Sequence, residues 1–302
     1  MTEAEFVWDV PEPLETVGVP VDADTTIIVR RHGNPDGQRL VLSHGNGLAT
    51  DLYYPFWSLL TDEFDVIIYD LRNHGWNELT SLDRHNVPTL VDDHDRILEA
   101  VDEGFGKKPK IGVYHSLSSI AALLSSTMGS GYEALILYDP PLRKPNVSDE
   151  QFDGVAIRTA AMVRRRTSRF RTTDEFSSIL PYIPAFQRMA PEAHDLIAKA
   201  TLRESRDGEG FDLRCPPEYE AQIIDYARIF FLAVDFEAMR CPLKVIGADP
   251  TLPYSYLPTL DLSDVAIVHY DFLPDTTHFL PLEKPEECAR ALREFLLHLP
   301  KL

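Results

Sequence analysis

Three residues of this chain could form a nucleophilic catalytic site, and they occur in the order Ser116, Asp249, His278. A serine hydroxyl is a weak nucleophile by itself, and it needs an adjacent base and an acid that orients that base. Each of the three comes soon after an apolar run typical of a β-strand, so each is expected in a turn at a strand end. The order and placement predict acyl transfer, with Ser116 as nucleophile, Asp249 as acid and His278 as base.

The turn that carries the serine is Tyr114-His-Ser-Leu-Ser118, between a predicted strand and a predicted helix. A strained nucleophile turn prefers the pattern G-x-S-x-G, because its neighbours are crowded. The position two residues after Ser116 is small, as the pattern requires, but Tyr114 replaces the first glycine. The tyrosine ring must therefore point away from the following helix, or the turn must open slightly. The alternative is that Ser116 merely caps that helix.

A glycine-bearing loop, His44-Gly-Asn-Gly47, follows another apolar run. Negative charge that develops on a carbonyl oxygen needs two preorganised N–H donors. We expect these donors to be the backbone N–H groups of Asn46 and Leu117. Gly45 and Gly47 allow the loop to turn towards a substrate. The alternatives are a plain strand-to-helix turn, and an Asn46 side chain that itself donates to the substrate.

The acid and the base each have rivals. Asp139 also follows a predicted strand, and it is the fallback acid in place of Asp249. His278 is favoured as the base because it follows the last predicted strand and precedes the final predicted helix. The other candidate bases, one of which is adjacent to the serine, are His44, His74, His94 and His115.

The loop Asp70-Leu-Arg-Asn-His-Gly75 contains residue types that could act in catalysis. Such a loop can instead tie its own turn together through side-chain hydrogen bonds. We therefore expect Asp70, Arg72 and His74 to be structural.

Several residues are candidates for contact with a substrate. Aromatic side chains in the middle of the chain could line an apolar pocket, although plain packing is their commoner role. The only basic cluster, Arg164-Arg-Arg166 with Arg169 and Arg171, is interpreted as a salt-bridged helix face; the alternative is a guide for an anionic substrate. The candidate substrate-binding residues are Gly45, Gly47, Tyr114, His115, Tyr182, Phe186 and Phe230.

Strands alternate with helices in the first 140 residues and again near the end, which predicts a parallel sheet built from βαβ units. Residues 141–235 lack clear strands and contain helical patterns interrupted by prolines. The predicted strands are Thr25–Arg30, Arg39–Ser43, Asp65–Tyr69, Lys110–Tyr114, Ala134–Tyr138, Pro242–Gly247 and Val265–Tyr270. The predicted helices of the α/β part are Thr89–Val101, Leu117–Met128 and Pro285–Leu297.

The composition excludes several classes of protein. With 29 basic and 48 acidic residues the net charge is −19, a surface that repels nucleic acid and anionic membranes. No apolar stretch is long enough for a membrane span, and residues 1–6 do not resemble a secretory signal. The three scattered cysteines predict reduced thiols and a cytoplasmic location. We expect no metal and no cofactor, because no motif for either occurs.

These segments together resemble the α/β-hydrolase superfamily over nearly the whole chain. The resemblance rests on His44–Gly47, Asp70–Gly75, His115–Leu117, Ala248–Pro250 and Thr277–Pro281. It implies an eight-stranded, mostly parallel sheet flanked by helices, over residues 1–140 and 236–302. It also implies a helical cap, residues 141–235, inserted after the sixth strand.

The predicted function is that of a cytoplasmic serine hydrolase for a small or medium ester, lactone or thioester. The expected partner is a small-molecule substrate, and homodimerisation is left open. The alternatives are a C–C bond hydrolase, a cofactor-free oxygenase or acyltransferase, and a ligand-binding member without catalysis.

Overall fold

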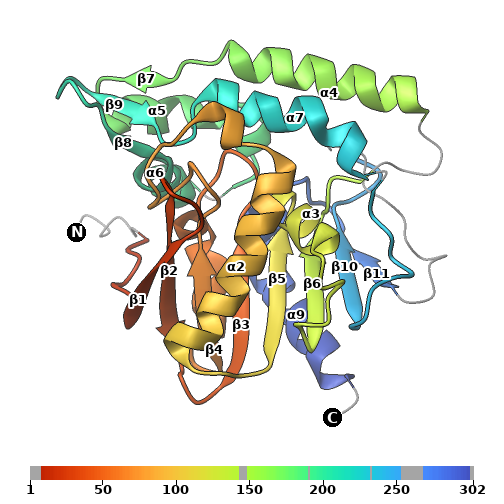
Figure 1. Cartoon of the computed structure of the whole chain (residues 1–302). Helices are drawn as coiled ribbons and strands as arrows, with labels where there is room; N and C mark the ends of the chain where they lie inside the picture. Colours follow the sequence, from red (N-terminus) through yellow and green to blue (C-terminus); the bar gives the residue numbers. More distant parts are fainter. Residues whose placement is uncertain (1–7, 143–147, 190, 232, 253–267, 300–302) are drawn as a thin grey trace, which may run out of the picture.

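The computed structural model describes residues 8–142, 148–189, 191–231, 233–252 and 268–299. An eight-stranded sheet runs through the molecule in the order β1-β2-β4-β3-β5-β6-β10-β11 (Figure 1). The pairs β1–β2 and β2–β4 are antiparallel and the other five pairs are parallel, which confirms the predicted mostly parallel sheet. The strands are β1 (Glu15–Pro20), β2 (Thr26–Gly33), β3 (Gln38–Ser43), β4 (Phe64–Tyr69), β5 (Lys110–His115), β6 (Ala134–Tyr138), β10 (Leu243–Gly247) and β11 (Val268–Phe272).

The central strands of the sheet are buried on both faces, and successive side chains of a strand enter different hydrophobic clusters. In β3, Leu40 and Leu42 join one cluster and Val41 joins the other. Helices α1 (Tyr54–Trp57), α8 (Leu280–Glu283) and α9 (Pro285–Leu297) pack in the first cluster. Helices α2 (Val87–Phe105) and α3 (Leu117–Leu124) pack in the second, and Figure 1 shows α2 across the front of the sheet. This arrangement explains the continuous apolar runs of the central strands.

Local signals fix the start of α2. The Asn86 side chain accepts a hydrogen bond from the Thr89 N–H, and Pro88 lies in the first turn, where its missing N–H costs nothing. The helix therefore begins two residues before the predicted range, and it continues to Phe105. No helix in the described ranges is both long enough and apolar enough to span a membrane.

The segment between β6 and β10 lies across one end of the sheet, and α4 and α7 run side by side there (Figure 1). The prediction that this segment lacks strands is wrong, because it contains a small three-stranded sheet in the order β7-β9-β8. Those strands have two or three residues each, too few to show a periodic pattern. Its elements are α4 (Asp149–Arg164), β7 (Arg169–Phe170), α5 (Thr173–Ile179), α6 (Pro191–Thr201), β8 (Leu202–Glu204), β9 (Phe211–Leu213) and α7 (Pro217–Phe231).

Three other differences concern element boundaries. Strand β1 was not predicted, because it is a mostly exposed edge strand with little apolar content. Helix α3 ends at Leu124 instead of Met128, and Met128 has a positive φ of 50°. The predicted strand Val265–Tyr270 corresponds to β11 from Val268 onwards, and its first three residues lie outside the described ranges.

Candidate active site

A serine, a histidine and an aspartate meet at the carboxyl ends of β5 and β6. Ser116 Oγ lies 2.9 Å from His278 Nε2, and His278 Nδ1 lies 2.5 Å from Asp139 Oδ2. A carboxylate only accepts, so the imidazole donates from Nδ1 to Asp139 and its Nε2 accepts from the Ser116 hydroxyl. All three residues are buried. This geometry lets the imidazole take the serine proton, with the carboxylate fixing the tautomer.

The expectation that Asp249 orients the imidazole is wrong: the carboxylate at His278 is the fallback, Asp139. Asp249 Oδ1 accepts from the Thr251 N–H at 2.8 Å and from the Thr251 hydroxyl, and its Oδ2 accepts from the Asp275 N–H at 2.7 Å. These bonds lower the pKa of Asp249, and the bond from the Thr251 side chain has the largest effect. The Asp249 carboxylate thus holds its own turn beside the loop that precedes His278.

Ser116 occupies a strained turn. Its φ of 53° lies in the left-handed region that disfavours residues with a side chain. The residue stands at the N-cap position of α3, but its side chain makes no capping hydrogen bond there. The interpretation of Ser116 as a helix cap is therefore wrong. The hydroxyl hydrogen-bonds to His278 Nε2 instead.

Tyr114 is accommodated because its ring points into the core. The side chain is fully buried, and its hydroxyl lies 2.8 Å from the Tyr132 hydroxyl. The Tyr132 hydroxyl also lies 2.8 Å from His94 Nε2, and His94 Nδ1 lies 2.8 Å from the Tyr69 hydroxyl. Tyr114 does not line the cavity at Ser116, so its predicted contact with substrate is wrong. A buried network of tyrosine and histidine side chains thus accommodates the tyrosine that stands where the pattern has glycine.

Two backbone N–H groups beside Ser116 are available as donors. Among the described residues, neither the Asn46 nor the Leu117 backbone N–H makes a hydrogen bond to another protein group. The Leu117 N–H is in the first turn of α3, where helical N–H groups have no partner within the helix. Both residues line the cavity at Ser116. They therefore match the expected position of an oxyanion hole.

In the glycine loop, residues 44–47, the backbone N–H groups on either side of Asn46 donate hydrogen bonds to side chains. The Gly45 N–H donates to the Tyr53 hydroxyl at 3.2 Å, and the Gly47 N–H donates to His74 Nε2 at 3.0 Å. The Asn46 side chain donates to the Glu220 carbonyl on α7 at 2.8 Å, while its Oδ1 has no hydrogen-bond partner. These bonds fix the loop and leave the Asn46 backbone N–H as a donor without a protein partner.

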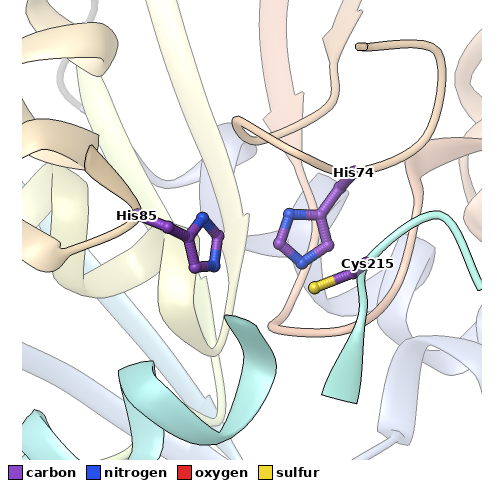
Figure 2. Close-up of side chains that lie close together, drawn as sticks. All are labelled: His74, His85 and Cys215. Carbon is purple, nitrogen blue, oxygen red and sulfur yellow. The ribbon is translucent and has the colours of Figure 1, made fainter. Parts of the chain in front are cut away.

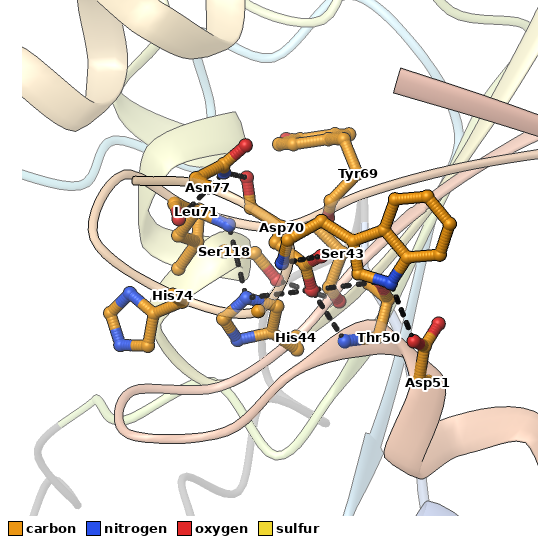
Figure 3. Close-up of polar contacts among 12 residues, drawn as sticks. Ser43, His44, Thr50, Asp51, Tyr69, Asp70, Leu71, His74, Asn77 and Ser118 are labelled. Carbon is orange, nitrogen blue, oxygen red and sulfur yellow. Dashed lines mark hydrogen bonds and ion pairs between the residues drawn. The ribbon is translucent and has the colours of Figure 1, made fainter. Parts of the chain in front are cut away.

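Asp70, Arg72 and His74 have structural partners, in agreement with their predicted role. Asp70 Oδ1 accepts from the Thr50 N–H and the Thr50 hydroxyl (Figure 3). Its Oδ2 accepts from Arg30. Arg30, with further bonds from buried N–H groups, holds the pKa of Asp70 at about 2 in spite of the opposing effect of burial. The ionised Asp70 carboxylate thus holds Thr50, in the segment that precedes α1.

Arg72 makes a bidentate ion pair with Asp93, with N–O distances of 2.8 and 2.7 Å. His74 Nδ1 donates to the Arg72 carbonyl, which leaves Nε2 to hold the glycine loop. Sequence reasoning gave no indication of this second contact, because His74 and Gly47 are 27 residues apart.

A cavity of about 440 Å³ opens above Ser116. Its floor includes the triad serine and histidine and the spare N–H donors, and its roof comes from α4, α7 and the loop after α5. Of the predicted substrate-binding residues, it contains Gly45, His115, Phe186 and Phe230. Gly47 does not line it, and Tyr182 is 82% exposed and turned away. Lining residues that sequence reasoning missed include Met162, Val163, Glu220, Ile223 and Ile224.

Most of the basic cluster is neutralised by ion pairs. Arg164 pairs with Glu218 and Asp225, and Arg169 pairs with Asp207. These contacts agree with the interpretation of a salt-bridged surface. Arg166 differs, because it lies at the cavity wall, where it pairs with the buried Glu220.

His74, His85 and Cys215 form a cluster of potential metal ligands within the described ranges, with ligand atoms at most 4.8 Å apart (Figure 2). The Asn73 side-chain oxygen Oδ1 accepts from the Thr80 N–H and hydroxyl, so the Asn73 side-chain Nδ2 donates to His85 Nδ1. His85 Nε2 therefore keeps its proton and has no lone pair to offer.

The other two members fit a metal poorly as well. His74 Nε2 already accepts from the Gly47 N–H, and burial raises the pKa of Cys215 well above its usual range. A histidine or cysteine that binds zinc must offer a neutral imidazole nitrogen with a free lone pair or a thiolate. The cluster is therefore a buried polar contact between the core and the inserted segment.

Comparison with known proteins places these features in context. A model of the alpha/beta hydrolase family matches residues 40–291. No curated protein matches the chain. Similar solved structures include E-2-(acetamidomethylene)succinate hydrolase, with 19% identity, a TM-score of 0.69, and coverage of 93% of this chain and 98% of that one. Another is a thermophilic esterase from Thermogutta terrifontis, with 21% identity, a TM-score of 0.63, and coverage of 95% and 100%. A third is the thioesterase domain from the curacin biosynthetic pathway, with 16% identity, a TM-score of 0.67, and coverage of 94% and 99%.

Proposed function

This chain belongs to the alpha/beta hydrolase family, and we propose that it is a serine hydrolase of uncharged carboxylic esters or thioesters. The observation that carries the proposal is the hydrogen-bonded series Ser116–His278–Asp139. The series is buried at the floor of a cavity, so a reacting carbonyl would be shielded from bulk water.

The proposed reaction follows from the protons of this series. His278 Nε2 takes the Ser116 proton while Oγ bonds to the acyl carbon, and the imidazolium then protonates the leaving alcohol or thiol. Asp139 stays ionised and stabilises the imidazolium. A water molecule, deprotonated by His278, then hydrolyses the acyl-enzyme and regenerates the serine hydroxyl.

The oxyanion of both tetrahedral intermediates is assigned to the N–H groups of Asn46 and Leu117. The support is that both N–H groups lack another acceptor and border the cavity at Ser116. Removal of one oxyanion donor typically costs about 10²–10³ in kcat. Because both donors belong to the backbone, side-chain substitution at either position leaves the donor itself in place.

The cavity favours a substrate with an apolar acyl or alcohol group. Its walls are mainly aliphatic and aromatic, as at Met162, Ile223 and Phe230. The charged pair at the wall, Arg166 and Glu220, is mutually neutralised, so it offers no net charge to an anionic substrate. The names of similar proteins include an esterase and a thioesterase, which agrees with an acyl substrate.

We further propose that residues 141–235 act as a cap over this site, since α4 and α7 supply the roof of the cavity. The proposed location is a reducing compartment such as the cytoplasm. The three cysteines, all buried, are free thiols, which suits such a compartment.

The test is intact-mass analysis after treatment with a fluorophosphonate, together with hydrolysis of p-nitrophenyl esters of increasing acyl length. We expect one adduct, and turnover that Ser116→Ala lowers by roughly 10⁶-fold. An adduct that persists in Ser116→Ala would exclude this nucleophile. Absence of both adduct and turnover would favour a ligand-binding protein or a cofactor-free reaction.

A further inference from the structure

A chain of hydrogen bonds passes behind Ser116 without using its hydroxyl or the ring nitrogens of His278. The Gly45 N–H lies 3.2 Å from the Tyr53 hydroxyl oxygen, and that oxygen lies 2.6 Å from His115 Nδ1. His115 Nε2 in turn lies 2.7 Å from the backbone carbonyl oxygen of His278. Tyr53 and His115 thus join the glycine loop to the backbone of the base, and we call these two residues the relay.

One arrangement of protons satisfies all three bonds. A carbonyl oxygen only accepts, so His115 Nε2 carries a proton and donates to the His278 carbonyl. Nδ1 of a neutral imidazole then accepts from the Tyr53 hydroxyl, whose oxygen accepts from the Gly45 N–H. Burial, with the nearby His278, lowers the pKa of His115 well below its ordinary value and keeps the imidazole neutral. The relay therefore has a fixed direction, from the glycine loop to the base.

The relay also packs directly against the residues that it connects. A Cβ atom at Gly45 would lie 2.9 Å from His115 Nδ1, so the loop backbone rests on the imidazole. The rings of His115 and His278 have centroids 4.9 Å apart. Both relay side chains are buried, so water does not compete for these bonds. Movement of either relay side chain would be transmitted to the loop and to the base.

We propose that Tyr53 and His115 are positioning residues, which keep the Asn46 N–H and the His278 imidazole in register around one reacting carbonyl. The proposal rests on the proposed function, because that register matters only if both groups act on the same acyl centre. Gly45 directly precedes Asn46, so the hydrogen bond from the Gly45 N–H to Tyr53 also fixes the position of the Asn46 N–H. In an active site, a displacement of about 1 Å can cost roughly 100-fold in rate.

Three relay variants separate its two ends. Tyr53→Phe removes the acceptor of the Gly45 N–H and the donor to Nδ1. His115→Gln can still donate to the His278 carbonyl, and His115→Asn can still accept from Tyr53. The matched control is Tyr69→Phe, which removes a buried tyrosine–histidine bond of 2.8 Å, from Tyr69 to His94, away from the cavity.

The first readout is kinetic. We expect Tyr53→Phe to lower kcat for a p-nitrophenyl ester by about 10- to 100-fold with KM within about twofold, because alignment and not substrate affinity is lost. Tyr69→Phe should leave kcat within about twofold, even where urea unfolding shows the same loss of stability. A double-mutant cycle of Tyr53→Phe with His115→Gln should be non-additive, because the two side chains share one bond. Equal kcat in Tyr53→Phe and Tyr69→Phe would overturn the proposal.

The second readout does not depend on turnover. Hydrogen–deuterium exchange of native protein should become faster in Tyr53→Phe for peptides that cover residues 44–48 and, at the far end of the relay, residues 278–282. Tyr69→Phe should change neither peptide. Faster exchange at both ends in an enzyme without ester turnover would support the relay and contradict the proposed function. Active wild-type protein with exchange unchanged at residues 278–282 in Tyr53→Phe would contradict the relay alone.

Discussion

Asp139 and His278 are 139 residues apart in the chain, yet Asp139 Oδ2 lies 2.5 Å from His278 Nδ1. The contact joins the end of β6 to the turn before α8. A second hydrogen bond, from the Ala248 N–H to Asp139 Oδ1 at 3.2 Å, holds the carboxylate in place from the neighbouring strand end. Asp139 also has a positive φ of 38°, which indicates a constrained turn.

A pair of isosteric substitutions distinguishes the two aspartates. Asp139→Asn should lower kcat by about 10⁴-fold, because the amide cannot stabilise the imidazolium and can impose the wrong tautomer. Asp249→Asn should lower kcat by less than about tenfold, since that side chain holds only its own turn. Steady-state ester hydrolysis measures both. The reverse ranking would restore Asp249 as the acid.

The buried tyrosine network predicts that a glycine introduced two residues before the serine lowers the stability of the fold. Tyr114→Gly would leave a cavity in a fully buried site, and we expect a loss of roughly 3–5 kcal/mol in unfolding free energy. Tyr114→Phe should cost about 1–3 kcal/mol, because it leaves the Tyr132 hydroxyl with one partner fewer. Urea denaturation measures both, and Tyr114→Phe should keep its esterase activity. A more stable Tyr114→Gly protein would refute this interpretation.

The glycine loop should not tolerate a side chain at Gly45. A Cβ there would lie 2.9 Å from His115 Nδ1 and 3.1 Å from Ser116 Cβ, so the loop or the serine turn must move. We expect Gly45→Ala to lower kcat by about 100-fold. Gly131→Ala is the matched control, since a Cβ at that position meets no atom within 4 Å. Comparable activity of the two variants would show that the loop adjusts freely.

Buried histidines make the fold sensitive to mild acid. Burial, as the main cause, lowers the pKa of His32 and of His85 from 6.5 to about 4. At a pH between these two pKa values, the unfolded chain binds more protons than the folded one. Stability is therefore lost as the pH falls from about 6.5 towards 4. Each such histidine can contribute up to about 1.4 kcal/mol per pH unit.

Urea unfolding between pH 7.5 and 4.5 measures this loss. His32→Phe should reduce its slope, because phenylalanine does not titrate. The ring can still pack on Trp57, whose centroid lies 4.8 Å from that of His32. His32 Nε2 has no hydrogen-bond partner, so its removal should cost little stability at pH 7.5. An unchanged slope in His32→Phe would mean that His32 takes up protons equally in the folded and unfolded states, which would contradict the lowered pKa.

The cluster of His74, His85 and Cys215 should not bind zinc. Its hydrogen bonds leave His85 Nε2 protonated and His74 Nε2 occupied. We therefore expect that neither EDTA nor a small excess of Zn²⁺ changes the melting temperature. A rise in melting temperature with Zn²⁺ that Cys215→Ala abolishes would show a site that rearranges on binding.

The sequence by itself predicted seven of the eight strands of the large sheet, and it singled out the serine and the histidine that meet in the candidate site. Apolar runs such as Val66–Ile68 are local signals, and each predicted a strand in the right place. Ser116 and His278 were recognisable because each follows such a run in a turn of special composition. The two expected oxyanion donors followed from the same local reasoning.

Only the tertiary structure decided which aspartate meets the imidazole. Asp139 and Asp249 follow neighbouring parallel strands, β6 and β10, so their local patterns are equivalent. The choice depends on which carboxylate already accepts hydrogen bonds within its own turn. Both oxygens of Asp249 do so, from Thr251 and Asp275. No local pattern reports that competition.

The relay and the buried tyrosine network likewise required the folded chain. Tyr53 and His115 are 62 residues apart, and Tyr69 and His94 are 25 residues apart. Hydrogen bonds between such residues form only after the sheet has brought them together, because a single side chain has no periodicity that marks its partner. The sequence thus indicated the candidate serine and histidine, and the three-dimensional packing determined which side chains hold them.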